Sequence, residues 1–439
     1  MAAILGGAFA IITMYSLSNP FVGLLGLLAA DMLRPGELYP SLAVFHIERL
    51  LAVVLMVSVL FHRQRLAWPP ITKSLLIFWG ALFISVPLSI WRTDALSNAI
   101  SFGRIIIYHV LVVNLVTTER RYRAFLLVYA ALIGWLAATS LYGLSHGLMY
   151  HGSESVERAE ALNSFGGNPN SLGISMVVSI PLVFLLLAKG SGIGRLVSMA
   201  VVVAAIATTI YTGSRTSYLA LAFLVLAAPL LRRKRLFYLP VAVLVISIIW
   251  MVTPQNYKDR VLSVESRNKD LSYINRLKAW EGGWRMFVDN PVTGVGVGEF
   301  AAANGMKYWP DPANRVWLNA HSLYFQCLGE LGLVGVISFL YFLYRFFRLN
   351  GELARRFDAD QSWASCVRNF PVACNLILLV LLFAGYSGHD LYRSTWYMMA
   401  GLAGALQLMV SSKVPAPEAE LTTAVAAGPP GMLREARRF

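Results

Sequence analysis

Apolar runs near the length of a membrane-spanning helix follow one another along most of this chain. A spanning helix needs about 20 predominantly apolar residues. Only 14% of the residues are charged, whereas soluble domains carry about 25%. The chain is therefore predicted to be an all-α polytopic membrane protein. Eleven runs lie at about 45–61, 71–91, 99–117, 124–145, 169–188, 195–211, 217–231, 236–253, 321–344, 369–386 and 393–411.

Residues 1–33 add one or two further helices to these runs. Asn19-Pro20 divides them into two apolar halves, which could form two short helices or one broken span. The segment lacks the basic n-region and the small-residue cleavage site of a signal peptide, so no removed leader is predicted. The prediction is thus a single helical domain of about twelve, or thirteen, membrane helices over 1–411. A Pro- and Ala-rich tail over 412–439 is predicted to be disordered.

Positive residues indicate which loops share a side of the membrane. Lys and Arg in short loops are retained on the cytoplasmic side, and they cluster in alternate loops such as Arg120, Arg121 and Arg123. The net charge of +14 follows largely from this retention, so no nucleic-acid partner is predicted. The C-terminal tail is expected to be cytoplasmic. The loops predicted to lie outside are those at about 92–98, 146–168, 212–216, 254–320 and 387–392.

The outside segment 254–320 is the only long hydrophilic interval in the chain, and its middle is predicted to form an amphipathic helix. Apolar residues spaced by four, three, four and three lie on one face of a helix, which predicts a helix from Ser272 to Val288. Asp289-Asn290-Pro291 should end it. Such a helix either packs against the bundle or lies in the headgroup interface. The apolar face consists of Tyr273, Leu277, Trp280, Trp284 and Phe287.

Arginines on the outside segments are candidate ligands of a phosphate group. Arg276 lies on the predicted amphipathic helix together with Lys278 and Arg285, and Arg215 lies in the short turn 212–216. Arginine binds phosphate oxygens with two parallel hydrogen bonds. Two arginines that converge on one point would bind a diphosphate. The alternative for each is a lipid headgroup or a backbone carbonyl.

His321 begins an apolar run directly after the long outside segment, so it is expected near the outer membrane boundary. A histidine with an unperturbed pKa of about 6.5 can accept a proton from a hydroxyl near neutral pH. The alternative is an interfacial histidine that only donates and accepts hydrogen bonds. The histidines form no metal-ligand spacing, and neither HEXXH nor Cys-X-X-Cys occurs. Neither a metal nor any other cofactor is predicted.

Glycines and polar residues elsewhere on the outside suggest further contacts. Gly294, Gly296 and Gly298 are predicted to let the backbone turn and approach another segment, and their N–H groups could assist in holding an anion. Asn168 and Asn170 open an apolar run, where they could cap a helix or help it attract an anion.

Three charged residues lie within apolar runs, namely Glu48, Arg49 and Arg104. A charge placed inside a membrane helix costs about 2.5–3.5 kcal/mol or more unless it is compensated. These residues are therefore predicted to face the bundle interior, where they would form ion pairs or line a substrate cavity.

Several stretches resemble the superfamily of O-antigen ligases and O-antigen polymerases, and most resemble the ligases. They are NRLKAWEGGWRMFVDNPVTGVGVGEF followed by AHSLYFQCLGELGLVG, together with TGSRTSY and GGNPNSLGISM, between residues of about 160 and 345. The resemblance implies a GT-C-like glycosyltransferase of the Gram-negative inner membrane. Residues 254–320 would be its large periplasmic loop, and its active site would face the periplasm.

The resemblance also implies a reaction and residues for it. The enzyme would transfer a glycan from undecaprenyl diphosphate to a lipid A-core sugar hydroxyl, with inversion and without a metal or nucleotide. His321 would be the base, while Arg215 and Arg276 would bind the donor diphosphate. Its partners would be the donor, the acceptor and membrane lipids. Candidate pocket-lining residues are Asn168, Asn170, Arg104, Trp280 and Trp284.

Three other functions remain open at this point. A repeat-unit polymerase would use a second carrier-linked glycan as acceptor, and a protein O-oligosaccharyltransferase would use a protein. A solute transporter is disfavoured, because transporters commonly contain matching halves with broken helices and none is evident here. The sequence leaves the oligomeric state and the sugar specificity open.

Overall fold

The computed structural model describes residues 1–62, 65–147, 158–163, 168–187, 192–230, 235–262 and 271–413. Every regular element within these ranges is helical, as predicted. All but the first two residues of the predicted tail, 412–439, lie outside them. The principal helices are α1 (Ala2–Ser16), α2 (Pro20–Leu33), α5 (Ile47–Phe61), α6 (Pro70–Ser85), α7 (Arg92–Leu115), α8 (Glu119–Ser145), α9 (Pro169–Leu187), α10 (Gly192–Tyr211), α11 (Arg215–Leu230), α12 (Arg235–Val252), α13 (Gln255–Leu262), α14 (Leu271–Asp289), α16 (Leu323–Ala359), α18 (Phe370–Ala384) and α19 (Ser394–Lys413). Short helices are α3 (Pro35–Leu38), α4 (Pro40–Ala43), α15 (Phe300–Ala303), the π-helix η2 (Asn304–Tyr308) and α17 (Ser365–Arg368).

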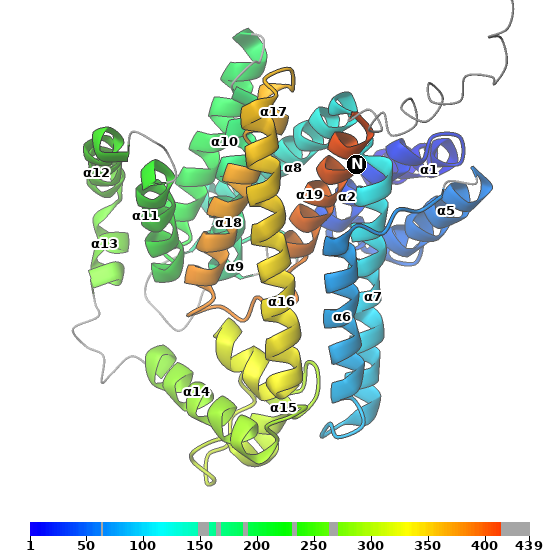
Figure 1. Cartoon of the computed structure of the whole chain (residues 1–439). Coiled ribbons are helices and arrows are strands. Elements are labelled where there is room, and N and C mark those ends of the chain that lie inside the picture. The colour runs from blue at the N-terminus through cyan, green and yellow to red at the C-terminus, as the bar shows by residue number, and fades with distance from the viewer. Residues whose placement is uncertain are drawn as a thin grey trace, which may run out of the picture.

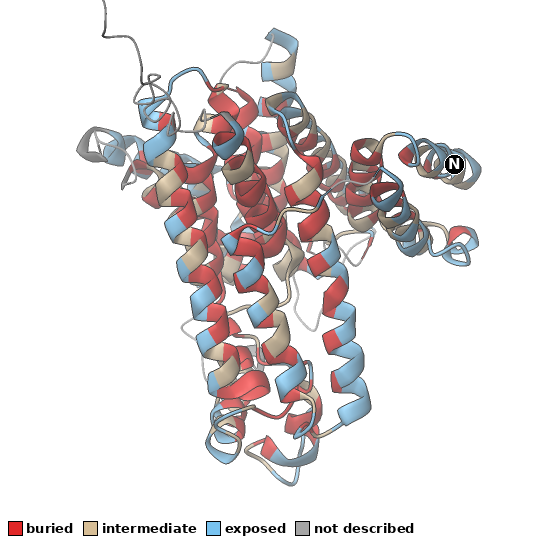
Figure 2. Ribbon diagram, turned by 45° about the vertical axis from the view of Figure 1, so that its right-hand side comes forward, coloured by how far each residue is buried: buried red, intermediate tan, exposed pale blue. Residues whose placement is uncertain are grey.

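The helices form one bundle with an additional layer at one end (Figure 1). α6, α7 and α16 run side by side, α14 and α15 lie beside the lower end of α16 in this view, and α1, α2 and α5 lie to one side. Buried residues lie in the interior of the bundle, whereas the outer faces and much of the N-terminal region are exposed (Figure 2). The core contains fully buried aromatic side chains, among them Phe78, Phe342 and Tyr397, which pack ring against ring.

The helices bear out a multi-pass membrane protein but leave the number of spans lower than expected. In the described part of the chain, six helices are long and apolar enough to cross a membrane, or seven if the bent pair Tyr238–Val252 and Gln255–Leu262 forms one span. Five apolar helices are shorter, including α6 and α18. Each of the eleven apolar runs contains a helix. Most of the shortfall lies in helix length, whereas α19 has 20 residues and is still not among these candidates. Residues 1–33 form two separate helices, α1 and α2.

The loops predicted to lie outside gather at one end of the bundle. The Asn98 Nδ2 atom donates to the Val297 carbonyl at 3.2 Å, which joins the start of α7 to the long segment 254–320. The Arg158 Nε atom donates to the Thr212 carbonyl at 2.7 Å, and Thr216 Oγ1 lies 2.7 Å from Ser387 Oγ. Segments from five different parts of the sequence therefore meet at a common end.

The glycine-rich segment passes through a break in α16. The backbone N–H groups of Val295 and Gly296 donate to the carbonyls of Gly329 and Glu330 at 2.9 and 3.0 Å. Gly332, with φ 58° and ψ −156°, interrupts the helix at that level. A Cβ atom on Gly294 would lie 2.3 Å from the backbone carbon of Glu330. The predicted close approach of this backbone to another segment is thus confirmed.

The same contacts overturn the suggestion that this segment holds an anion. The N–H groups of Val295 and Gly296 are bonded to backbone carbonyls. The Val297 N–H donates to Ser85 Oγ at 3.2 Å and the Gly298 N–H to Glu330 Oε2 at 3.0 Å. Because these four N–H groups already have protein acceptors, they anchor the loop to the bundle.

Gly294→Ala should destabilise the protein because the added Cβ atom meets backbone. Gly294 also has a φ of 67°, and such strain costs about 1–3 kcal/mol in a non-glycine residue. We expect an apparent Tm several degrees lower in a thermal unfolding scan of the detergent-solubilised protein. Gly80→Ala in α6 is the matched control, since nothing lies within 4 Å of its added methyl. Equal Tm values for the two variants would contradict this account of the loop.

Candidate active site

α14 forms where the amphipathic helix was predicted, but it packs with a different face. Ala279 and Met286 are fully buried, and the buried pair Gly282 and Gly283 allows close packing against Asn304 and Phe300. The predicted stripe is largely exposed instead, with Tyr273 at 37%, Leu277 at 42% and Trp284 at 52%. The alternative in which the stripe packs against the bundle is therefore wrong for these three residues. Small residues bring the helix backbone closer than aromatic residues could, which leaves the larger apolar side chains facing outward.

Trp280 is the member of the stripe that lies beside the candidate site. Its ring stacks on Phe325 with a centroid distance of 5.7 Å and meets Tyr386 edge-on at 5.0 Å. Its indole nitrogen is buried without a hydrogen-bond partner. Trp284 is exposed and contacts Phe287 at 5.6 Å. Of the two tryptophans suggested as pocket lining, Trp280 thus borders the α18–α19 loop.

Arg276 reaches from α14 to the loop between α18 and α19. Its Nη1 atom donates to Ser387 Oγ at 2.6 Å. The same hydroxyl oxygen lies 2.7 Å from Thr216 Oγ1, in the first turn of α11. One serine hydroxyl therefore joins Arg276 to the residue that follows Arg215.

Arg215 is held at the turn between α10 and α11. Its Nε atom donates to the Arg260 carbonyl at 3.0 Å, and the Arg260 Nε atom donates to the Gly213 carbonyl at 2.8 Å. Gly213 has a φ of 56°, and the Arg260 side chain packs next to the position that a Cβ atom on Gly213 would take. These reciprocal bonds dock α13 on the turn. They also give Arg215 the backbone-carbonyl contact that the sequence left as an alternative.

His321 occupies a strained position immediately before α16. Its φ is 45°, which is uncommon for a residue with a Cβ atom and is often found at functional sites. The Leu323 N–H donates to the Gly385 carbonyl at 2.7 Å, which ties the start of α16 to the α18–α19 loop. The His321 ring meets the His389 ring edge-on at 5.1 Å. Within the described ranges neither imidazole has a hydrogen-bond partner.

Burial and neighbouring charge keep both imidazoles neutral. Burial, with smaller contributions from His389 and Arg276, lowers the pKa of His321 to about 4. Burial is also the main cause of the lowered pKa of His389, to which Arg393 and Arg276 add and which Asp390 opposes. The field of Arg276 thus reaches both rings. The expectation that His321 has an unperturbed pKa near 6.5 is thus corrected. His321 is a weaker base whose imidazole is uncharged around pH 7.

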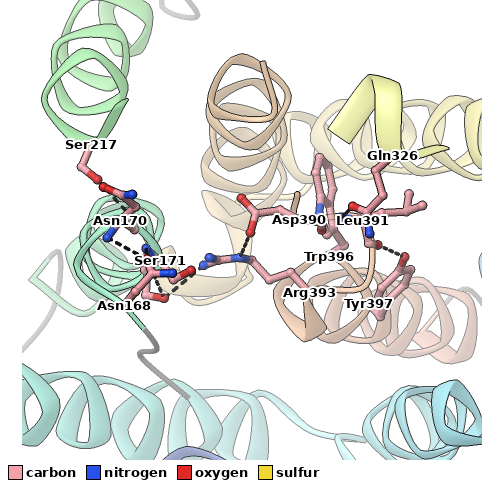
Figure 3. A network of polar contacts seen from close by, with 11 residues as sticks. Asn168, Asn170, Ser171, Ser217, Gln326, Asp390, Leu391, Arg393, Trp396 and Tyr397 are labelled. Carbon is pink, nitrogen blue, oxygen red and sulfur yellow. Dashed lines mark hydrogen bonds and ion pairs between the residues drawn. The ribbon is translucent and has the colours of Figure 1, made fainter. Parts of the chain in front are cut away.

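The loop between α18 and α19 is fixed by a network that Figure 3 draws. Arg393 forms an ion pair with Asp390 at 3.0 Å and donates to Ser175 Oγ on α9 at 3.0 Å. The Leu391 N–H donates to Gln326 Oε1 on α16 at 3.3 Å, and Tyr397 Oη donates to the Leu391 carbonyl at 2.6 Å. The loop is therefore held by α9, α16 and α19, which gives Ser387 and His389 a fixed frame.

This loop contains the residues that the sequence analysis missed. Ser387, His389, Asp390 and Arg393 come from a short interval that charge placed on the outside. Its signal is the sequence SGHDLYR, in which a hydroxyl, an imidazole, a carboxylate and a guanidinium lie within seven residues of an outside loop. Nothing in the sequence indicates that this interval meets Arg276 and His321.

Asn168 and Asn170 serve the end of α9. Asn168 Oδ1 accepts from the N–H groups of Asn170 and Ser171 at 3.0 and 3.1 Å, so the capping interpretation is confirmed. Asn170 Oδ1 accepts from Arg158 Nη2 at 2.7 Å. Figure 3 shows both asparagines at the helix end from which Ser175 reaches Arg393.

Arg104 does not face the bundle interior, contrary to the prediction. Its side chain is exposed, and its Nε atom donates to the Ser101 carbonyl of its own helix at 3.3 Å. It acts electrostatically on Asp31 and Glu48, so its charge is compensated by neighbouring helices at the bundle surface. Arg49 is likewise exposed and Glu48 is partly buried. Among the residues placed by the structure, no three potential metal ligands form a cluster.

Comparison with known proteins finds a family match over the central part of the chain. Residues 199–340 match the sequence model of a family described as O-Antigen ligase. The matched range contains Arg215, Arg276 and His321, as well as α14 and the start of α16. The resemblance seen in the sequence is thereby confirmed over this range. No characterised protein matches the chain significantly.

Proposed function

Because residues 199–340 carry a domain of the O-antigen ligase superfamily, we propose that the protein transfers a glycan from undecaprenyl diphosphate to a sugar hydroxyl of lipid A-core. One observation carries this proposal. Arg276, the first turn of α11 and His321 come from distant segments and meet around the α18–α19 loop. Together they offer cations for a diphosphate and a neutral imidazole for a hydroxyl.

The donor diphosphate would bind to Arg276 and Arg215. A guanidinium can make two parallel hydrogen bonds to phosphate oxygens, and bonds to charged groups contribute about 1.5–3 kcal/mol each. In the protein without a donor, the hydrogen bonds to Ser387 Oγ and to the Arg260 carbonyl hold the two guanidinium groups in place. Such preorganisation matters because fixed charges cost no reorganisation when negative charge develops on the leaving group.

In the transfer step the acceptor oxygen attacks the anomeric carbon of the donor glycan. The bond from that carbon to the phosphate oxygen breaks, and its electron pair leaves with undecaprenyl diphosphate. His321 takes the proton of the acceptor hydroxyl. Because attack and departure occur on opposite faces of the carbon, the configuration inverts.

Donor binding should strengthen His321 as a base. In the free protein, burial together with the charges of the surroundings holds its pKa near 4. A diphosphate on Arg276 brings negative charge, which stabilises the imidazolium and opposes the effect of the arginine. The base would therefore become effective when the leaving group is in place.

The exposed stripe of α14 fits an orientation with this site at the outer face of a Gram-negative inner membrane. Tyr273, Leu277 and Trp284 are exposed on one side of the helix. Aromatic and aliphatic side chains on such a helix enter the boundary between headgroups and acyl chains. The stripe would place Arg276 at the depth of the carrier diphosphate, with the active site in the periplasm and the C-terminus in the cytoplasm.

The function is tested by offering one donor to different acceptors. Purified protein in lipid nanodiscs would receive an undecaprenyl-diphosphate glycan with lipid A-core, with a second carrier-linked glycan, or with an unfolded periplasmic protein. We expect product on lipid A-core. Product only on the second glycan would indicate a polymerase, and product only on protein an oligosaccharyltransferase. No product with any acceptor, together with solute uptake into liposomes, would reject glycan transfer.

Ser387→Ala should weaken donor use without unfolding the protein. It removes the hydroxyl that joins Arg276 to Thr216, and a lost hydrogen bond to a charged group costs about 1.5–3 kcal/mol. We expect kcat/KM for the donor to fall by about tenfold or more. Ser387→Thr keeps a hydroxyl and should retain most activity. Equal kcat/KM values for the Ala, Thr and native proteins would show that this contact does not position Arg276.

A further inference from the structure

An open cavity, of about 360 Å³, lies between the start of α7 and the segment that leads into α15. Its walls include two tryptophans, Trp91 and Trp317, and its polar groups include Asp94, Asn98 and Glu299. We propose that this cavity binds a pyranose unit of a neutral or amino-substituted glycan. The proposal rests on the function above, because it supplies that reaction with a place for the glycan away from the reacting carbon.

The two tryptophans form a rigid, accessible aromatic wall. Their ring centroids lie 5.5 Å apart, and the residues are 39% and 56% exposed. Trp317 lies flat on Gly305 of the π-helix η2, where a Cβ atom would come within 2.3 Å of the indole. A pyranose has one face of C–H groups, which packs favourably on an indole. Exposed tryptophans held in this way are suited to binding a ring rather than to filling a core.

The polar side of the cavity contains a carboxyl group that lacks a protein partner. Glu299 is only 2% exposed, it lines the cavity, and its side chain has no hydrogen-bond partner among the residues described. A carboxyl group that lines an open cavity and has no protein partner is available to bind a ligand or water. Burial and the charge of Asp94 raise the pKa of Glu299 to about 7. Near neutral pH the carboxyl can therefore both accept from and donate to sugar hydroxyls.

The charges of the cavity select among glycans. Asp94 and Glu299 are both acidic, and no basic residue is among those described as lining it. An acidic sugar such as a uronic acid would meet like charge, whereas a neutral or an amino sugar would not. The ligand class is thus a pyranose without a carboxylate.

The cavity lies within reach of the candidate active site. Trp317 precedes His321 by four residues, and an extended chain spans at most about 3.3–3.6 Å per residue. Their Cα atoms are therefore at most about 14 Å apart. A second connection passes through Glu330, whose Oε2 atom accepts from the Gly298 N–H at 3.0 Å and from Tyr392 Oη at 2.6 Å. A glycan of a few units attached at the reacting carbon or hydroxyl could enter the cavity.

The test measures glycan binding directly, without turnover. The probe is the oligosaccharide released by mild acid from the surface polysaccharide of the source strain, which carries no lipid and no diphosphate. Its dissociation constant for the full chain in nanodiscs would be measured by calorimetry. Loss of an aromatic contact is worth roughly 0.5–1.5 kcal/mol, so we expect Trp317→Ala to weaken binding by about two- to twelvefold. Glu299→Gln and Gly305→Ala should weaken it as well.

Two further variants make the result specific. Trp284→Ala removes an exposed tryptophan of the same long segment and should leave the dissociation constant unchanged. His321→Ala should lower the transfer rate by at least about 100-fold while keeping native binding, which separates the cavity from the reaction. Native affinity in both Trp317→Ala and Glu299→Gln, or no measurable binding to the unaltered protein, would overturn the proposal. Tryptophan-dependent binding by a protein that transfers no glycan would retain the cavity and reject the proposed function.

Kinetics then identify the source of the sugar. If the donor glycan occupies the cavity, Trp317→Ala should raise KM for the carrier-linked donor. If the acceptor occupies it, KM for lipid A-core should rise instead. An unchanged KM for both substrates, alongside unchanged oligosaccharide binding, would again contradict the proposal.

Discussion

Arg276→Ala should lower the rate of glycan transfer by about 100- to 1,000-fold, the range observed when one preorganised group that stabilises developing charge is removed. The leaving diphosphate gains negative charge as the glycosidic bond breaks. Arg276 is the cation that is hydrogen-bonded at Ser387 and that also acts on His321 and His389. Turnover of purified variants with a carrier-linked donor measures this effect. An unfolding midpoint Tm equal to that of the native protein would show that the fold of the variant is intact.

Two variants define what Arg276 contributes. Arg276→Lys keeps the charge but loses the planar pair of donors, so its activity should lie between those of the native protein and the alanine variant. Arg285→Ala is the matched control, because Arg285 lies on the same helix in an exposed pair with Glu281. Exposed pairs contribute about 0–1 kcal/mol, so near-native activity is expected. Equal losses in Arg276→Ala and Arg285→Ala would mean that general positive charge, rather than this position, is required.

His321→Ala should reduce turnover by about 100- to 10,000-fold, the usual contribution of a general base. His389→Ala should have a smaller effect, because its ring contacts His321 and would position or polarise it rather than take the proton. A His321→Ala protein that transfers glycan at the native rate would reject the base assignment. A larger loss in His389→Ala than in His321→Ala would exchange the two roles.

The pH profile provides a second test of His321. The base form is the neutral imidazole, and a pKa lowered to about 4 keeps that form present at all pH values well above 4. We therefore expect kcat/KM, which reports the free enzyme, to remain level from pH 8 to about 5 and to fall below that. The acidic fall of kcat should occur at higher pH than that of kcat/KM, because the bound diphosphate raises the pKa of His321. A kcat/KM limb near 6.5 would indicate an exposed, unperturbed histidine.

Local features of the long outside segment could be predicted from sequence because they depend on neighbouring residues. The spacing of apolar residues predicted a helix from Ser272 to Val288, and α14 spans Leu271–Asp289. The glycines at 294, 296 and 298 indicated a close backbone approach. Asn168 was recognised as a potential cap from its place at the start of an apolar run. In each case the chemistry of a few consecutive residues determines the local structure.

Features that depend on packing between distant segments could not be predicted in the same way. Hydrophobicity left two environments open for the aromatic stripe of α14, the bundle or the headgroup interface. Gly282 and Gly283 pack against the neighbouring segment instead, and Tyr273, Leu277 and Trp284 stay exposed. Arg104 was expected inside the bundle, yet a surface position lets it act on Asp31 and Glu48. Ser387 and His389 gain their importance from contacts with residues over 60 positions away. A single sequence does not contain those pairings.

The most direct test of the central claim is a transfer assay that compares Arg276→Ala, His321→Ala and Arg285→Ala in nanodiscs. The donor would be an undecaprenyl-diphosphate glycan, the acceptor lipid A-core, and product would be measured as glycan-modified lipid A-core. We expect native product formation in Arg285→Ala and a loss of at least about 100-fold in each of the other two. Native rates in both Arg276→Ala and His321→Ala would contradict the account, because the reaction would then proceed without the groups that meet at the α18–α19 loop.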